Sequence, residues 1–184
     1  KEPPHRIECY DISHFQGSQS VGSQVVSENG VFATDHYRRY KIKSKTAGDD
    51  YAAMAEVLGR RLDHEEWDEP DLIIIDGGKG QLSAACQALK ELDLEKKVAI
   101  VGIAKRLEEI FFPNDKHPLY LDKRSESLKV IQFMRNEAHR FSIKHHRNKR
   151  SKSALHSEFE NIKGIGQKNK ESLFKKFKTI EAIK

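Results

Sequence analysis

Two aspartates lie on strands that the sequence predicts, and this setting favours metal chemistry. Asp76 closes the short apolar run Leu72–Ile75 and is followed by a glycine cluster, while Asp11 follows a strand-like run that begins at Ile7. A carboxylate at the end of a buried strand is costly unless something pairs with it. On neighbouring strands, Asp11 and Asp76 would give a hard divalent cation two oxygen ligands and leave room for water and phosphate.

Each of these features also has a simpler interpretation. Asp11 alone fits a surface or turn aspartate, and Asp76 alone fits a helix N-cap. The glycines at 77, 78 and 80 do not form a P-loop, because that motif requires the pattern GxxxxGK followed by Ser or Thr. We interpret them as a turn that lets backbone and substrate approach closely, with Lys79 as a candidate phosphate contact. A plain strand-to-helix turn is the alternative.

Two further residues are candidates with an open role. His139 lies on an expected long helix, four residues after Arg135 and seven before His146. Single histidines are often structural, so residue type alone does not assign it to chemistry. Asp50 stands where an N-cap belongs, before the apolar periodicity of residues 51–62. Capping is therefore the leading interpretation of Asp50, and a functional carboxylate is the second.

The basic residues cluster in two segments, within a chain of formal net charge +5. Residues 140–152 contain six Lys or Arg and no acidic residue, and this run includes Arg147, Lys149 and Arg150. Residues 163–178 contain six Lys against one Glu. Such clustering is typical of nucleic-acid binding, whereas a solvated surface or linker is the alternative. Arg38 is a further candidate phosphate contact.

The second basic segment contains a small glycine motif. Lys163, Gly164 and Gly166, followed by Lys168, lie between two stretches that are predicted to be short helices. Glycines in a hairpin between helices expose backbone amides, which can bind a phosphate without reading bases. An ordinary helical turn is the alternative, and the lysine density favours DNA.

Composition excludes several classes of protein. The chain has 184 residues, of which 33% are charged and 37% hydrophobic, and no apolar run approaches the ~20 residues of a membrane span. The first residues lack the apolar region of a secretory signal and an initiator Met, so we expect a part of a longer protein. Cys9 and Cys86 lack metal-ligand spacing, and we expect reduced thiols of a cytoplasmic protein.

The expected elements form a mixed sheet flanked by helices. A small all-α segment would follow, with a domain boundary after residue 150 and a linker at 150–156. Helices are expected at 51–62, 81–92 and from 125 to the late 140s, and strands at 7–14, 20–27, 31–43, 72–75, 98–104, 110–112 and 119–121.

Several motifs in order resemble the C-terminal half of bacterial UvrC, a component of the UvrABC excinuclease. They are Tyr10-Asp-Ile-Ser-His14, Tyr37-Arg-Arg-Tyr40, Gly48-Asp-Asp-Tyr-Ala-Ala-Met54, Ile75-Asp-Gly-Gly-Lys-Gly-Gln-Leu82, Val130-Ile-Gln132, Glu137-Ala-His139 and His146-Arg147. The resemblance covers essentially the whole chain. It implies an RNase H-like endonuclease domain over residues 1–150, and a linker with the first helix-hairpin-helix motif over 151–184.

The resemblance also implies a function. The family makes dual incisions in nucleotide excision repair, and this half makes the cut on the 5′ side of the lesion. The implied catalytic residues are Asp11, Asp76 and His139, with Asp50 as a further acidic position. The implied cofactor is Mg²⁺ or Mn²⁺ held by Asp11 and Asp76. The implied partners are damaged double-stranded DNA and UvrB, whose contact region lies outside this chain.

Two rival functions remain open at this point. A catalytically silent DNA-binding module would use the basic segments and the hairpin, with the carboxylates serving only structure. Another RNase H-like nuclease, such as a ribonuclease or a resolvase, is the second rival. The linked helix-hairpin-helix segment favours duplex DNA over an RNA–DNA hybrid.

Overall fold

A computed structural model describes residues 3–15, 18–43, 50–64, 66–91, 93, 95, 98–104 and 108–160, with side chains described for fewer of them. The chain divides into two compact units, Lys1–Ser142 and Ile143–Lys184. The first unit contains every described strand. The motif at Lys163–Lys168 lies outside the described residues, as does most of the expected helix-hairpin-helix segment.

A mixed sheet forms the centre of this unit, as the sequence predicted. Strand β1 pairs antiparallel with β2 and parallel with β5, β5 pairs parallel with β6, and β6 pairs antiparallel with β7. The short strands β3 and β4 both pair antiparallel with β2. The strands of the described chain are β1 Arg6–Phe15, β2 Ser18–Glu28, β3 Val31–Phe32, β4 Arg38–Lys41, β5 Leu72–Asp76, β6 Ala99–Ala104 and β7 Glu109–Phe111.

The expectation of one continuous strand over residues 31–43 is wrong. A 3₁₀ turn at Thr34–His36 separates β3 from β4, although both strands pair with β2. The polar run Thr34-Asp-His36 has no buried residue, so no apolar side chain of the turn packs into the core. Phe32 of β3 lies opposite Ser27 of β2, whereas Arg39 of β4 lies opposite Ser23, so the turn shifts the pairing by three residues and reverses which residues of β4 face each side.

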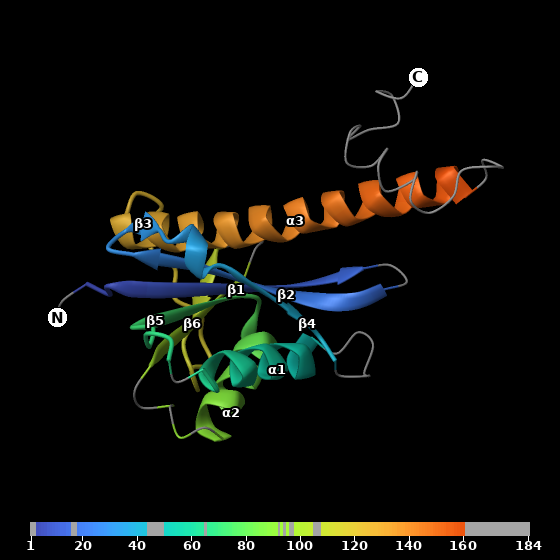
Figure 1. Ribbon diagram of the computed structural model, residues 1–184. Coiled ribbons are helices and arrows are strands. Elements are labelled where there is room, and N and C mark those ends of the chain that lie inside the picture. Colours follow the sequence, from blue (N-terminus) through green and yellow to red (C-terminus); the bar gives the residue numbers. More distant parts are fainter. Residues whose placement is uncertain are drawn as a thin grey trace. The chain divides into compact units, whose positions relative to one another are not determined.

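Helices cover both faces of the sheet (Figure 1). Helices α1, Asp50–Leu62, and α2, Lys79–Glu91, pack on one face, and helix α3, Glu126–Glu160, begins on the other. Strand β5 alternates between the two cores, because Ile73 and Ile75 pack toward α1 and α2 whereas Ile74 packs toward α3. Burial on both faces explains why this strand is an unbroken apolar run in the sequence.

Helix α3 begins where the sequence indicated. The Ser125 Oγ accepts a hydrogen bond of 3.2 Å from the Leu128 backbone N–H, which is the geometry of an N-cap. Leu128, Met134 and Ala138 are buried, with Ile131 packed beside them, so the predicted apolar stripe faces the sheet. The helix runs on to Glu160, through the residues 150–156 that were expected to be a linker. No helix in the described part of the chain has the length and apolar character needed to cross a membrane.

A buried ionic network ties β1 to helix α1 on the face opposite α3. Glu8 is fully buried and accepts hydrogen bonds from Arg61 Nη2 at 2.9 Å, Arg6 Nε at 3.1 Å and the Tyr10 hydroxyl at 2.5 Å. Arg61 is 1% exposed. Charges taken out of water are tolerated only with partners of this kind. The network therefore fixes the position of β1, the strand that also carries Asp11.

Candidate metal centre

Asp11 and Asp76 lie next to each other on the sheet. Strands β1 and β5 are parallel with Tyr10 opposite Ile75, so the next residue of each strand is a carboxylate. Directly opposed residues share a face of the sheet, and this face is the one that α3 covers. Both aspartates are buried, each with 4% of its surface exposed.

Helix α3 adds an imidazole to the two carboxylates. One ligand atom each from Asp11, Asp76 and His139 can be chosen so that all three lie within 4.8 Å of one another. His139 is exposed while the carboxylates are buried, so the cluster opens toward solvent on the helix side. Two carboxylate oxygens suit a hard divalent cation, and an imidazole nitrogen can complete its ligand set, so the residues present fit a divalent cation.

A buried thiol reports the electrostatics of this cluster. Cys9 lies on β1 two residues before Asp11 and is fully buried. Burial raises the pKa of the Cys9 thiol well above its usual value, the charges of Asp76 and Asp11 raise it further, and Arg135 lowers it. At Cys9 the charges of Asp76 and Asp11 therefore act against the charge of Arg135, and the two aspartates supply the negative charge that a cation site requires.

Aromatic contacts hold α3 in the position that brings His139 over the sheet. Phe133 of α3 stacks on Phe32 of β3 with ring centroids 4.2 Å apart, and Phe141 meets Tyr37 edge-on at 5.1 Å. The Tyr37 hydroxyl also donates a hydrogen bond of 3.0 Å to Glu137 Oε1. These contacts lie before and after His139 along the helix, so they fix its rotation as well as its position.

Glu137 is charged in this contact at neutral pH. Arg140 donates two hydrogen bonds of 2.6 Å to its carboxylate. These bonds lower the pKa of Glu137, while burial raises the pKa of Tyr37 above the usual range of a phenol. The tyrosine therefore remains a hydrogen-bond donor and the glutamate an acceptor.

The glycine turn after Asp76 places Gln81 over the end of β5. The Gly77 backbone N–H donates to Ile75 O at 2.9 Å and Ile103 O at 3.1 Å, which closes the turn tightly. A Cβ added at Gly77 would lie 1.4 Å from Gln81 Oε1, so a side chain there would displace Gln81. The glycine thus serves close approach, as predicted, but the approaching group in this structure is the Gln81 side chain.

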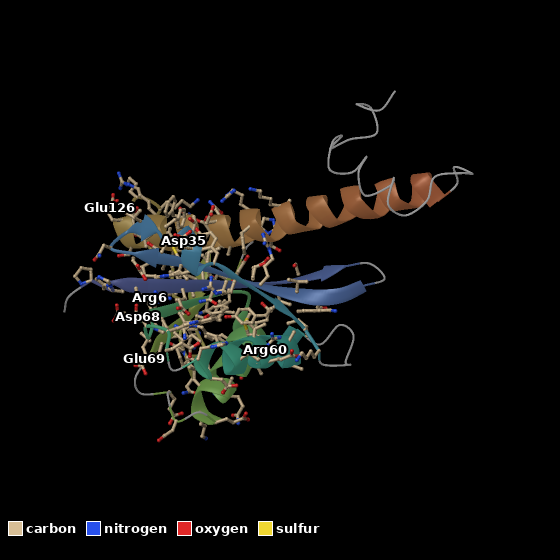
Figure 2. All side chains as sticks on the ribbon, viewed as in Figure 1. Arg6, Asp35, Arg60, Asp68, Glu69 and Glu126 are labelled. Atoms are coloured by element: carbon tan, nitrogen blue, oxygen red, sulfur yellow. The ribbon has the colours of Figure 1, made fainter. Side chains whose placement is uncertain are left out.

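Other predicted residues lie elsewhere. Arg38 faces the α1 side, where its guanidinium lies 5.0 Å from the Trp67 ring centroid, and it lines a cavity of about 150 Å³ with Arg6 and Asp68, both labelled in Figure 2. Lys79 begins α2 and lines a cavity of about 240 Å³ with Asn114 and Lys116.

For the remaining candidates the structure gives only the backbone or nothing. Asp50 begins α1, and Arg147, Lys149 and Arg150 lie within α3, but none of these side chains is described. Lys163, Gly164, Gly166 and Lys168 fall outside the described residues. Three residues near the cluster carry no signal in the sequence. Arg39 shares a sheet face with Asp11, Arg135 is near enough to lower the pKa of Cys9, and Gln81 lies against the turn after Asp76.

Comparison with known families gives a clear match. The model of the UvrC RNase H endonuclease domain matches residues 1–143. UvrABC system protein C of Christiangramia forsetii is 54% identical over 187 residues, covering 100% of this chain and 31% of the relative. The same protein of Porphyromonas gingivalis strain W83 is 50% identical over 185 residues, covering 99% and 31%. The chain thus spans about a third of the length of these curated relatives.

Solved structures give only distant matches. Endonuclease V of Ciona intestinalis, in complex with an inosine-containing DNA, is 17% identical, with a TM-score of 0.43, and the match covers 73% of this chain and 56% of that one. Human endonuclease V is 15% identical with a TM-score of 0.40, covering 61% and 51%. Scores this low carry no argument about function.

Proposed function

The chain belongs to the UvrC RNase H endonuclease domain family, and from that premise we propose that it hydrolyses a phosphodiester bond of DNA with a divalent cation. The observation that carries this proposal is the cluster of Asp11, Asp76 and His139 at the boundary between buried sheet and solvent. A strand of DNA can reach this boundary from the His139 side.

Asp11 and Asp76 would hold the cation, Mg²⁺ or Mn²⁺, through their carboxylate oxygens. When bound, such an ion polarises a phosphoryl oxygen and lowers the charge repulsion between phosphate and an attacking water. The parallel pairing of β1 with β5 sets the two carboxylates side by side.

His139 has two roles available. It can complete the ligand set with an imidazole nitrogen, or it can accept the proton of the attacking water as a general base. Asp50 remains a further proposed carboxylate. Its place at the start of α1 is known, and its function is proposed only from the family resemblance.

The finer function is also a proposal. We infer an incision on the 5′ side of a lesion during nucleotide excision repair in the bacterial cytoplasm, with damaged duplex DNA and UvrB as partners. Arg147, Lys149, Arg150 and the Lys163–Lys168 motif would contact DNA phosphates in this scheme. Lys79 at the end of the Asp76 turn is a further proposed phosphate contact. The names of the relatives support the proposed role in excision repair, and the net charge of +5 supports the proposed contacts with DNA.

Nicking of duplex DNA tests the proposal. We expect the chain to nick lesion-bearing duplex in the presence of Mg²⁺ or Mn²⁺ and to lose this activity after chelation. DNA binding without any metal-dependent nicking would instead favour the silent binding module. Preferential cleavage of an RNA–DNA hybrid or of a four-way junction would favour the other RNase H-like nucleases.

Replacing His139 by Ala should abolish incision with little effect on thermal stability. The side chain is exposed and lies off the apolar stripe, so its loss leaves no cavity in the core. A titration of activity with Mn²⁺ separates the two roles. Loss of a ligand weakens apparent metal affinity and lets activity return partly at high Mn²⁺, whereas loss of a general base leaves metal affinity unchanged and gives no recovery.

The matched control is His117→Ala, which removes an exposed histidine from the turn between β7 and Leu119. It should incise like the unmodified chain. Normal incision by the His139→Ala protein at ordinary metal concentration would remove His139 from the mechanism.

A further inference from the structure

The candidate site continues across the sheet beyond its two carboxylates. Strand register places Asp11 opposite Ser23 of β2, and Ser23 opposite Arg39 of β4. With Asp76 beside Asp11, the row Arg39–Ser23–Asp11–Asp76 crosses four strands. Directly opposed residues project from the same face, so the four side chains share the side of the sheet that α3 covers.

Contacts of the side chains support this assignment of faces. The Arg39 guanidinium lies 3.7 Å from the centroid of the Phe141 ring, and Phe141 belongs to α3 two residues after His139. Its neighbour Arg38 projects to the opposite face, over Trp67. One of these two adjacent arginines therefore shares a face with the metal cluster, and the other does not.

Arg39 is held in place but keeps the means to bind an anion. Its Nη2 donates a hydrogen bond of 3.3 Å to Phe141 O. Among the described residues, this is the only hydrogen bond of the guanidinium, which has five N–H groups. The side chain is exposed. A planar guanidinium stacked on an aromatic ring is preorganised for two-point contact with phosphate oxygens.

The spacing of the strands determines which phosphate Arg39 can reach. Two strand spacings separate the backbones of β4 and β1, or about 10 Å. Arg39 is thus too far from Asp11 to contact the phosphate that the cation would bind. It lies on the same face of the sheet, where it can reach the next phosphate along the strand. A DNA strand whose scissile phosphate meets the carboxylates would pass a neighbouring phosphate over β4.

We propose that Arg39 binds a backbone phosphate next to the scissile one and so positions the DNA strand at the carboxylate cluster. The inference rests on the proposed nuclease function, because it takes the carboxylate cluster as the place of cleavage. It assigns to Arg39 a contact with the sugar–phosphate backbone, without base recognition. It also replaces Arg38, the arginine that sequence reasoning chose.

Salt dependence of DNA binding is the decisive measurement. The unmodified chain, Arg39→Gln and Arg38→Gln are titrated with an undamaged duplex at several salt concentrations, without divalent metal. Each phosphate contact contributes about −0.9 to the slope of log affinity against log salt for duplex DNA. We expect Arg39→Gln to make the slope shallower by about 0.9, and Arg38→Gln to leave it unchanged.

A second variant separates binding from anchoring of α3. Arg39→Lys keeps the charge but cannot form the planar fork, so it should retain the salt slope while weakening binding several-fold at fixed salt. If Arg39 only anchored the helix, both Arg39 variants would lower the melting temperature and leave the slope unchanged. An unchanged slope in Arg39→Gln, or an equal change in Arg38→Gln, overturns the inference.

Incision kinetics then distinguish this inference from the function on which it rests. Loss of a uniform binding contact raises KM and leaves kcat nearly unchanged, so we expect this split for Arg39→Gln. If Arg39→Gln has a shallower slope but the unmodified chain does not nick DNA, the nuclease function is wrong and the phosphate contact stands. If the unmodified chain nicks DNA but Arg39→Gln leaves the slope unchanged, the nuclease function stands and the phosphate contact is wrong.

Discussion

Asp76→Asn and Asp11→Asn should each reduce incision by a factor of about 10² or more, while the fold is retained. Asparagine has nearly the shape of aspartate but no charge, so each variant removes half of the negative charge that the two strands offer to a cation. Because the carboxylates lie within 4.8 Å of each other, neutralising one also relieves repulsion between like charges. Thermal stability without metal should therefore be maintained or raised.

A measurement of metal binding makes this prediction independent of the activity assay. Calorimetric titration with Mn²⁺ should show much weaker binding by either variant than by the unmodified chain. The control is Asp63→Asn, which changes an exposed carboxylate after α1 on the other side of the sheet and should affect neither measurement. Normal Mn²⁺ binding and normal nicking by a folded Asp76→Asn protein would show that the metal centre has been placed wrongly.

Glu8→Ala should lower the free energy of unfolding by about 3–5 kcal/mol, the usual cost of removing one partner from a buried ion pair. The variant leaves Arg61, which is 1% exposed, and Arg6, which is 5% exposed, without the carboxylate between them. Urea unfolding followed by circular dichroism would measure the loss. DNA contacts are not involved, since Glu8 projects away from the metal cluster.

Glu126→Ala is the matched control for this variant. Its carboxylate is 85% exposed and pairs with Lys129, a contact whose loss should cost well under ~1 kcal/mol. A second comparison separates charge from packing. Combining Glu8→Leu with Arg61→Met removes both charges and should restore part of the stability that Glu8→Ala loses. Equal small losses for Glu8→Ala and Glu126→Ala would contradict the importance of the buried network.

The sequence was sufficient to predict the carboxylates because their signal is local. The apolar run Leu72–Ile75 that ends in Asp76 can be recognised without knowledge of the fold, and Asp11 lies within residues 7–14, which are predicted to be a strand. The parallel pairing of β1 with β5 then brings them together. His139 required the position of α3 as well, and the contacts that dock this helix come from Phe32 and Tyr37, about 100 residues earlier in the chain.

The choice between Arg38 and Arg39 could not be made from sequence. On a strand, neighbouring residues face opposite sides, so the assignment depends on the register of β4 against β2. The 3₁₀ turn at Thr34–His36 interrupts the run that looked continuous, and with it the count of residues that would have fixed the faces. A strand assumed to be unbroken therefore gives no safe basis for choosing between adjacent arginines.

The Glu8 network was missed for a different reason. Charged residues are usually exposed, and the two partners Glu8 and Arg61 are 53 positions apart in the chain. No short pattern connects them. Only the packing of α1 on the sheet reveals that both are buried.

Strand β1 carries the Glu8 network on one face and Asp11 on the other, three residues apart, and this arrangement has a genetic consequence. Under the proposed repair function, a screen for cells that fail to survive DNA damage would recover substitutions at Glu8 and Arg61 together with those at Asp11 and Asp76. The first pair would fail because too little folded protein accumulates, and the second because abundant protein is inert. Immunoblotting of the mutant strains would divide the collection into these two groups, and growth at reduced temperature should rescue only the first.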